Sequence, residues 1–179
     1  MSRTEPHPDK TTSTLSIVQP RATDAAAVHA LIARCPPLDR NSLYCNLLQC
    51  SDFAESCALA RLDGRVAGFV SGYLPPRKPN VLFIWQVAVD SAARGHGLAR
   101  RLIQDILDRD ACADVEWIHT TVTPGNEASR AMFTRLAEEL GAGVEVRPHF
   151  DRHVHLAGQA DSEELFLIGP FVARGSTGG

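Results

Sequence analysis

The chain has 179 residues, a length that suits one domain with one substantial core. Hydrophobic residues make up 44% and charged residues 22%, both ordinary for a globular protein in water. The net charge is −3, basic residues are scattered and aromatic residues make up only 6%, so no electrostatic footprint for nucleic acid exists, and we expect no nucleic-acid partner.

Membrane insertion and disulfides are also excluded by the sequence pattern. No segment approaches the ~18 consecutive apolar residues that span a bilayer, and the polar residues 1–14 lack the apolar core of a signal peptide. We therefore expect a cytoplasmic protein with no membrane partner. The five cysteines are odd in number and lack Cys-x-x-Cys spacing, which favours reduced thiols; they are Cys35, Cys45, Cys50, Cys57 and Cys112.

The first half of the chain predicts a short strand, two helices and a hairpin. Residues 1–14 and 172–179 are expected to be flexible tails around a single domain, 15–171. A strand is predicted over 15–18, then a helix capped by Thr23 or Asp24 with Ala27 and Leu31 on its apolar side, ending at Pro36. Residues 42–50 form a weaker helix prediction, and strands over 57–62 and 66–73 flank the hairpin signal Asp63-Gly64.

The second half alternates strands and helices. Residues 81–89 are almost continuously apolar, which is typical of a strand in mid-sheet covered on both faces. An amphipathic helix follows over 97–109, with Leu98, Leu102 and Ile106 on its apolar face. A strand over 116–122, a helix beginning near Asn126, and strands over 144–150 and 164–168 complete the order.

The most informative segment is Arg94-Gly95-His96-Gly97-Leu98-Ala99, between the apolar strand and the amphipathic helix. Two glycines allow a tight turn with several N–H groups pointing one way, and the helix adds the positive end of its dipole. This geometry predicts a pyrophosphate site. The alternative is an ordinary glycine turn, and a Gly-x-Gly-x-x-Gly/Ala dinucleotide fingerprint fails because position 100 is Arg.

The spacing of Arg94, Gly97 and Ala99 resembles the phosphate loop of the GCN5-related (GNAT) N-acetyltransferases, and the order of elements agrees over about 150 residues. The resemblance implies an α/β fold with a central mixed, mostly antiparallel twisted sheet of about seven strands flanked by about four helices. It also implies acetyl-CoA as cosubstrate, with no metal.

The same resemblance assigns the cofactor contacts. Val87, Ala88 and Val89 are implied to contact the pantetheine arm, and Arg94, Gly95, His96, Gly97, Leu98 and Ala99 to cradle the phosphates. Asn126, Ser129 and Phe133 match a further cofactor motif, although Asn126 is equally well explained as a helix N-cap.

The implied chemistry is direct attack of a neutral amine on the thioester. A backbone N–H of Val87 or Ala88 is the natural donor to the developing oxyanion. Many relatives carry Tyr where Phe133 stands, and that hydroxyl protonates the leaving thiolate; Phe133 cannot, so water or another hydroxyl has to serve. Phe133 also leaves open a non-catalytic module that only binds acetyl-CoA.

Three segments, 35–48, 83–89 and 121–126, resemble a branch of that family that acetylates the γ-amine of L-2,4-diaminobutyrate in ectoine synthesis. The resemblance covers residues 15–171 and implies a homodimer. A diamino acid needs acidic acceptors and an aromatic face for its ammonium groups. At the positions that match this branch, the resemblance implies Asp39, Tyr44, Trp85 and Glu163 as the acceptor site, and Asp39 or Glu163 would orient the amine and help to remove its proton.

Several alternatives stay open at the acceptor site. Asp39 and Glu163 could be solvated surface carboxylates, Trp85 a core residue, and the acceptor another small amine or polyamine. In the same branch a His often stands where this chain has Ala160, so His153 or His155 is a candidate substitute. The histidines at 149, 153 and 155 lack the companion ligands of a closed metal site, which favours no metal.

Overall fold

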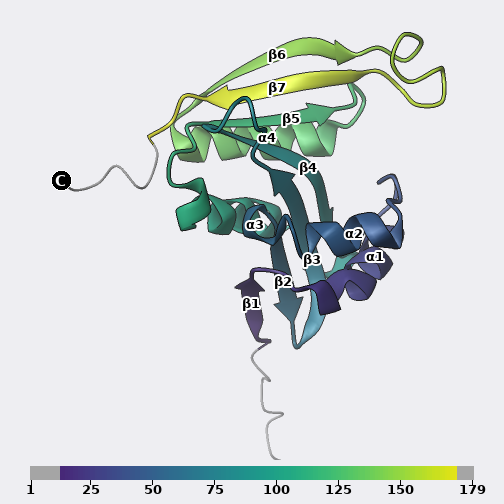
Figure 1. The fold of residues 1–179 in the computed structure, drawn as a ribbon, viewed down its shortest axis with the longest axis vertical. Coiled ribbons are helices and arrows are strands. Elements are labelled where there is room, and N and C mark those ends of the chain that lie inside the picture. Colours follow the sequence, from purple (N-terminus) through teal and green to yellow (C-terminus); the bar gives the residue numbers. More distant parts are fainter. Residues whose placement is uncertain (1–12, 173–179) are drawn as a thin grey trace, which may run out of the picture.

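The computed structural model describes residues 13–172 as a seven-stranded sheet with helices on both faces (Figure 1). The helices are α1 (Ala25–Ala33), α2 (Leu43–Gln49), α3 (Leu98–Leu107) and α4 (Glu127–Leu140), and the strands are β1 (Leu15–Val18), β2 (Ala58–Leu62), β3 (Arg65–Tyr73), β4 (Val81–Val89), β5 (Trp117–Val122), β6 (Gly143–Phe150) and β7 (Glu163–Gly169). The predicted fold class and the predicted order of elements are confirmed. The predicted tails lie almost entirely outside the described residues, so the domain boundaries stay a prediction.

The sheet has the order β1-β2-β3-β4-β5-β7-β6, and only the β4–β5 pair is parallel. β4 therefore lies in the middle, as its apolar sequence predicts. The hairpin between β2 and β3 turns at Asp63 (φ 51°) and Gly64 (φ 79°). Two successive positive φ values define the turn that matches the twist of antiparallel strands, which explains why Asp-Gly directs the chain here.

The two faces of the sheet are covered by different helices. α3 buries Leu102, Ile103 and Ile106 completely against β2, β3 and β4, and α4 extends the same core with Phe133 and Leu136. On the opposite face, α1 packs its apolar side on Leu59, Phe69 and Ala88; that side consists of Ala25, Val28, Leu31 and Ile32. The prediction that Ala27 belongs to this side is wrong, because Ala27 is exposed and the next residue, Val28, is buried in its place.

The start of α1 also differs from the prediction. A 3-10 turn over Ala22–Asp24 precedes the helix, and Asp24 occupies the N-cap position without a capping bond from its side chain. Its carboxylate instead accepts hydrogen bonds from the Arg21 N–H and from Arg61 of β2. The acidic side chain therefore joins the helix start to the sheet rather than capping the helix.

α1 and α2 cover only part of their face of the sheet, and the area over part of β4 and along β5 and β7 is left open. Trp85 of β4 is 49% exposed there, so the prediction that this strand is covered on both faces holds only for part of its length. The outer strand β6 is exposed along all eight residues. Among residues 13–172 no helix is long and apolar enough to cross a bilayer.

Candidate active site

The sheet opens between its two central strands. β4 and β5 pair only where Val81–Ile84 runs beside Trp117–Thr120, and β4 then continues to Val89 without a partner on that side. Beyond Thr120, β5 stays paired with β7 and diverges with it (Figure 1). The unpaired half of β4 therefore offers free main-chain groups to a ligand in the gap, because every second N–H and C=O of a strand points to the same side.

The glycine segment after β4 is built as predicted. Asp90 caps a 3-10 turn over Ser91–Ala93 through a bond from the Ala92 N–H, and this bond holds the pKa of Asp90 below its ordinary value. The chain then passes through Gly95 (φ 82°) and Gly97 (φ 69°), the second of which precedes the first residue of α3. The N–H groups of the first helical turn have no acceptor within the helix, so they are available to an anion.

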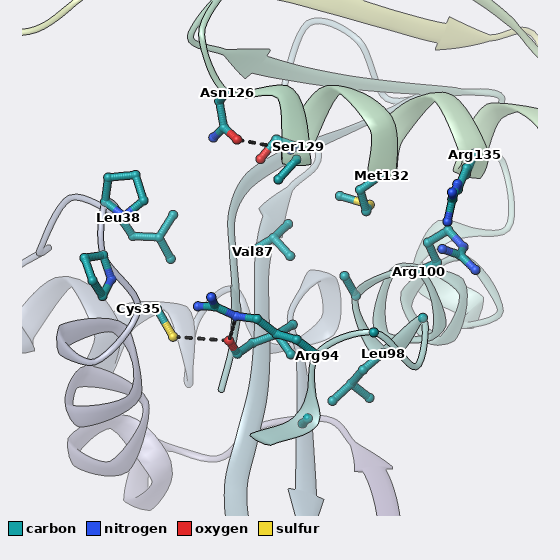
Figure 2. Close-up of a pocket in the computed structure, with 18 residues that line it drawn as sticks. Cys35, Leu38, Val87, Arg94, Leu98, Arg100, Asn126, Ser129, Met132 and Arg135 are labelled. Carbon is teal, nitrogen blue, oxygen red and sulfur yellow. Dashed lines mark hydrogen bonds between the residues drawn. The ribbon is translucent and has the colours of Figure 1, made fainter. Parts of the chain in front are cut away.

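A cavity of about 390 Å³ lies between this segment, α4 and the loop that follows α1 (Figure 2). Val87 and Val89 form its floor at the unpaired part of β4. A side chain added at Gly95 would meet nothing within 4 Å, so the loop leaves open space beside its amides. The residues present therefore fit an elongated ligand that carries phosphates at the α3 end and a slender arm along β4.

The cavity is positively charged. Of the described residues that line it, Arg94, Arg100 and Arg135 carry charge and none is a carboxylate. Arg94 donates from Nε to the Val89 carbonyl at 3.0 Å, and Arg100 donates to Glu139 of α4 at 2.7 Å. In Figure 2, Arg100 and Arg135 lie together at one end of the cavity. Three guanidinium groups beside a helix N-terminus form a strong site for phosphate groups.

Most of the predicted cofactor residues come together around this cavity. Those that line it are Val87, Val89, Arg94, Gly95, Gly97, Leu98, Ala99, Asn126 and Ser129. Asn126 also caps α4, since its Oδ1 accepts a hydrogen bond from the Ser129 N–H at 3.1 Å.

Three of the predicted cofactor residues do not line the cavity. His96 is exposed, and Ala88 is buried under α1 on the other face of the sheet. Phe133 is 3% exposed within the core. Ala88 can therefore contact a ligand in the gap only through its backbone, because its side chain lies on the other face.

Several lining residues were missed at the level of sequence. Arg100 of α3 and Arg135 of α4 were not among the predicted site residues, yet both line the cavity; Arg100 is half-buried and Arg135 is exposed. Cys35 and Leu38 come from the loop after α1, and the Cys35 thiol donates to the Val89 carbonyl at 3.4 Å. A basic residue directly after a phosphate loop was an available signal for Arg100; the other three depend on tertiary packing.

Part of the predicted acceptor site lies beside β4 on the opposite face. The Asp39 carbonyl accepts a hydrogen bond from Gln86 Nε2 at 2.8 Å, which brings the loop of Asp39 against the strand next to Trp85. Tyr44 lies in the first turn of α2 and is 68% exposed. Trp85, at 49% exposed, is not a core residue.

Glu163 lies on the other arm of the opening. It is the first residue of β7, and its Oε1 accepts a hydrogen bond from Thr123 at the end of β5 at 3.1 Å. Asp39 and Glu163 therefore belong to opposite sides of the gap between β4 and β5. Nothing joins these two carboxylates directly among the contacts of the described residues.

The histidines after β6 form a local turn. His155 Nδ1 accepts from the Asp151 N–H at 2.9 Å, and the Asp151 carboxylate accepts from the His153 and Val154 N–H groups. These bonds lower the pKa of Asp151. Across residues 13–172, no group of three or more His, Cys, Asp or Glu side chains is arranged to hold a metal ion.

Comparison with known proteins places the chain in a class. Residues 25–137 match the model of the acetyltransferase (GNAT) family. The chain belongs to this family, and it is an acyltransferase. The ribosomal-protein-S18-alanine N-acetyltransferase of Escherichia coli, at 18% identity and a TM-score of 0.61, shares the fold alone.

The more similar relatives form one group. The chain is 47% identical over 167 residues to the L-2,4-diaminobutyric acid acetyltransferase of Methylotuvimicrobium alcaliphilum, covering 93% of this chain and 97% of that protein. It is 51% identical to the enzyme of that name from Bordetella parapertussis, covering 85% and 82%. The structure of diaminobutyrate acetyltransferase EctA from Paenibacillus lautus, in complex with L-2,4-diaminobutyric acid and coenzyme A, is 37% identical, with a TM-score of 0.85 and coverage of 89% and 97%.

Proposed function

We propose that this chain transfers the acetyl group of acetyl-CoA to the 4-amino (γ) group of L-2,4-diaminobutyrate, giving N4-acetyl-L-2,4-diaminobutyrate. One observation carries the proposal: a positively charged cavity beside a glycine loop meets a strand whose opposite face carries the acceptor candidates. The names of relatives that are 47% and 51% identical support the acceptor. The product is the precursor for ectoine synthesis, which implies a role in osmoadaptation in the cytoplasm.

The cosubstrate supplies an acetyl thioester, and residues of this chain hold it. Gly95, Gly97 and the first turn of α3 would bind the diphosphate, and Arg94 and Arg100 would neutralise it. Val87 and Val89 would contact the arm. The thioester would then lie in the gap between β4 and β5.

The main chain of β4 provides the oxyanion donor. Successive N–H groups of a strand point in opposite directions, so of the Val87 and Ala88 amides one pairs with β3 and the other points into the gap. An N–H held there by the sheet needs no reorganisation when negative charge develops on the carbonyl oxygen. As the amine nitrogen bonds to the carbonyl carbon, the carbon–sulfur bond breaks and the thiolate leaves.

Asp39 and Glu163 are proposed to receive the ammonium groups of the acceptor, with Trp85 and Tyr44 as aromatic contacts. The carboxylate that faces the γ-amine would take up its proton, directly or through water. Water is the proposed acid for the thiolate, because Phe133 carries no proton and is buried in the core. An alkyl thiol has a pKa of about 8.5, so the thiolate leaves readily near neutral pH.

A homodimer is proposed as the working form. The edge strand β6 exposes Val144 (40%), Val146 (39%) and Phe150 (40%), and unpaired edge strands with apolar side chains favour pairing with another chain. We expect sedimentation to give twice the chain mass of 19.4 kDa, and Val146→Glu to give a monomer. A wild-type monomer at micromolar concentration would rule the dimer out.

The acceptor is tested by thiol release with a panel of amines. Diaminobutyrate is expected to react at least tenfold faster, by kcat/KM, than ornithine, lysine or putrescine, because one methylene is worth ~1–3 kcal/mol in a fitted site. NMR of the product should place the acetyl group on the γ-nitrogen. Equal rates across the panel would overturn the proposed acceptor, and tight coenzyme binding without turnover would overturn the enzyme activity.

A further inference from the structure

We infer that Gln86 is a positioning residue: it fixes the acceptor loop against the cofactor strand and so restricts the chain length of the diamino acid. This inference rests on the proposed function. The acceptor loop is the segment 35–41 between α1 and α2, which contains Asp39. Nothing in the sequence pattern singles out Gln86, since it is one polar residue within an apolar strand.

A bulge in β4 turns Gln86 toward the acceptor loop. Ile84 pairs with Gly72 and Gln86 pairs with Ser71, so Trp85 is an extra residue without a partner on β3. In a regular strand Ile84 and Gln86 would share a face. Here Ile84 packs in the core under α3, whereas Gln86 bonds to the loop on the other face. The extra residue therefore places Trp85 and Gln86 together on the acceptor side.

Gln86 makes two hydrogen bonds with the acceptor loop. Its Nε2 donates to the Asp39 carbonyl at 2.8 Å, and its Oε1 accepts from Asn41 Nδ2 at 3.1 Å. The side chain is only 8% exposed, so water competes weakly for these bonds. A primary amide suits both partners, because a carboxylate could not donate to the carbonyl and an ammonium could not accept from Asn41.

The loop is fixed to the same strand at a second point. The Cys35 thiol donates to the Val89 carbonyl, three residues beyond Gln86. The segment from Cys35 to Asn41 is therefore held at both ends along the unpaired half of β4. Val87, the residue after Gln86, lines the cofactor cavity.

This arrangement sets the distance between the amine and the thioester. The carboxylate that would hold the acceptor belongs to Asp39, and the thioester site begins at Val87. Gln86 connects the two, because its side chain bonds to the Asp39 carbonyl and its main chain continues directly to Val87. A methylene added to the acceptor or removed from it shifts the reacting nitrogen by about 1 Å, and a misplacement of that size lowers rates by up to ~10²-fold. With the loop released, Asp39 can follow a longer or shorter acceptor, and this discrimination should fall.

The test replaces Gln86 with Met, which keeps the length of the side chain and removes both bonds. We expect the KM for diaminobutyrate to rise about 5- to 30-fold, as the loss of one or two net hydrogen bonds implies. The ratio of kcat/KM for diaminobutyrate over ornithine, and over 2,3-diaminopropionate, should fall by a similar factor. The KM for acetyl-CoA should change less than the KM for diaminobutyrate, because the phosphate end of the cavity is untouched and only the first part of the acceptor loop, Cys35 to Leu38, lines the cofactor cavity.

Gln49→Met is the matched control. Gln49 is a glutamine of α2 that is 2% exposed, and its Oε1 accepts a hydrogen bond from Asn46 Nδ2 at 3.0 Å. This variant should lower the melting temperature while leaving the selectivity ratios unchanged. Gln86→Glu keeps the acceptor for Asn41 and loses the donor to Asp39, so its ratio should be intermediate.

A double-mutant cycle tests whether Asn41 and Gln86 act together. If Asn41 acts through Gln86, then Asn41→Ala lowers the selectivity in the wild type and changes little when added to Gln86→Met. Should Gln86→Met be insoluble, Asn41→Ala alone still removes one of the two bonds and should give part of the loss. The inference would be overturned if both Gln86→Met and Asn41→Ala kept the selectivity of the wild type. A wild-type enzyme without selectivity would instead overturn the proposed acceptor.

Discussion

Replacing Gly97 with Val should strongly weaken coenzyme binding. Gly97 has φ 69° and lies immediately before α3, at the rim of the phosphate end of the cavity. A Cβ at this position would stand 3.0 Å from Nη2 of Arg100, and the two γ-methyl groups of Val would extend further into the same space. The substitution therefore displaces a guanidinium and obstructs the amides at the start of the helix.

Two free-energy terms give the magnitude. A left-handed conformation costs a residue with a Cβ about 1–2 kcal/mol in the folded state. At roughly 2–4 °C per kcal/mol for a domain of this size, the melting temperature should fall by about 2–8 °C. Each charge-assisted hydrogen bond lost to the diphosphate removes about 1.5–3 kcal/mol, so the Kd for CoA should rise ~10- to 100-fold.

Calorimetric titration with CoA and thermal unfolding separate the two terms. Gly141→Val is the matched control, because Gly141 has φ 64° at the end of α4, its Cβ would meet nothing within 4 Å, and it does not line the cavity. Both variants should lose similar stability, and only Gly97→Val should lose affinity. An unchanged Kd in Gly97→Val, or an equal loss in Gly141→Val, would refute the assignment of this loop to the diphosphate.

Four further outcomes are expected. Asp39→Asn should raise the KM for diaminobutyrate and leave that for acetyl-CoA unchanged in steady-state assays. Arg109→Ala should lower the free energy of unfolding by about 2–4 kcal/mol in urea, because its guanidinium donates to three main-chain carbonyls, whereas Arg147→Ala in an exposed ion pair should not change it measurably. Asn126→Ala should remove about 1 kcal/mol as a lost N-cap. Burial raises the pKa of Cys57 from 9.0 to about 12, so the unfolded thiol ionises first and the melting temperature should fall as pH rises above 9, less steeply in Cys57→Ala.

The fold could be predicted from local patterns because those patterns agree with the packing. Leu102 and Ile106 share one face of α3, and both are fully buried. Asp63-Gly64 adopts the two positive φ values that its sequence favours. The failures arise where helix ends adapt to tertiary structure, as at Asp24, whose carboxylate bonds to Arg61 instead of capping α1.

The candidate site could be predicted only where it is contiguous in sequence. The glycine loop and the apolar strand adjoin one another, so their spacing alone indicated a phosphate site. Arg135 and Leu38 reach the cavity from separate elements, and no periodicity of α4 or of the acceptor loop reports that. Gln86 was missed because its role depends on a bulge, which shifts the side-chain alternation in a way that a regular strand pattern does not anticipate.

The parting of β4 from β5 has a consequence for how the reaction proceeds. In the proposed mechanism, coenzyme would enter from the side of α3 and α4, and the amine would meet Trp85 and Asp39 from the other side of the sheet. Neither reactant would then block the entrance of the other. Both could bind at the same time in a ternary complex, and no acyl-enzyme intermediate would be needed. A site with separate entrances for its two substrates should give double-reciprocal plots that intersect rather than run parallel.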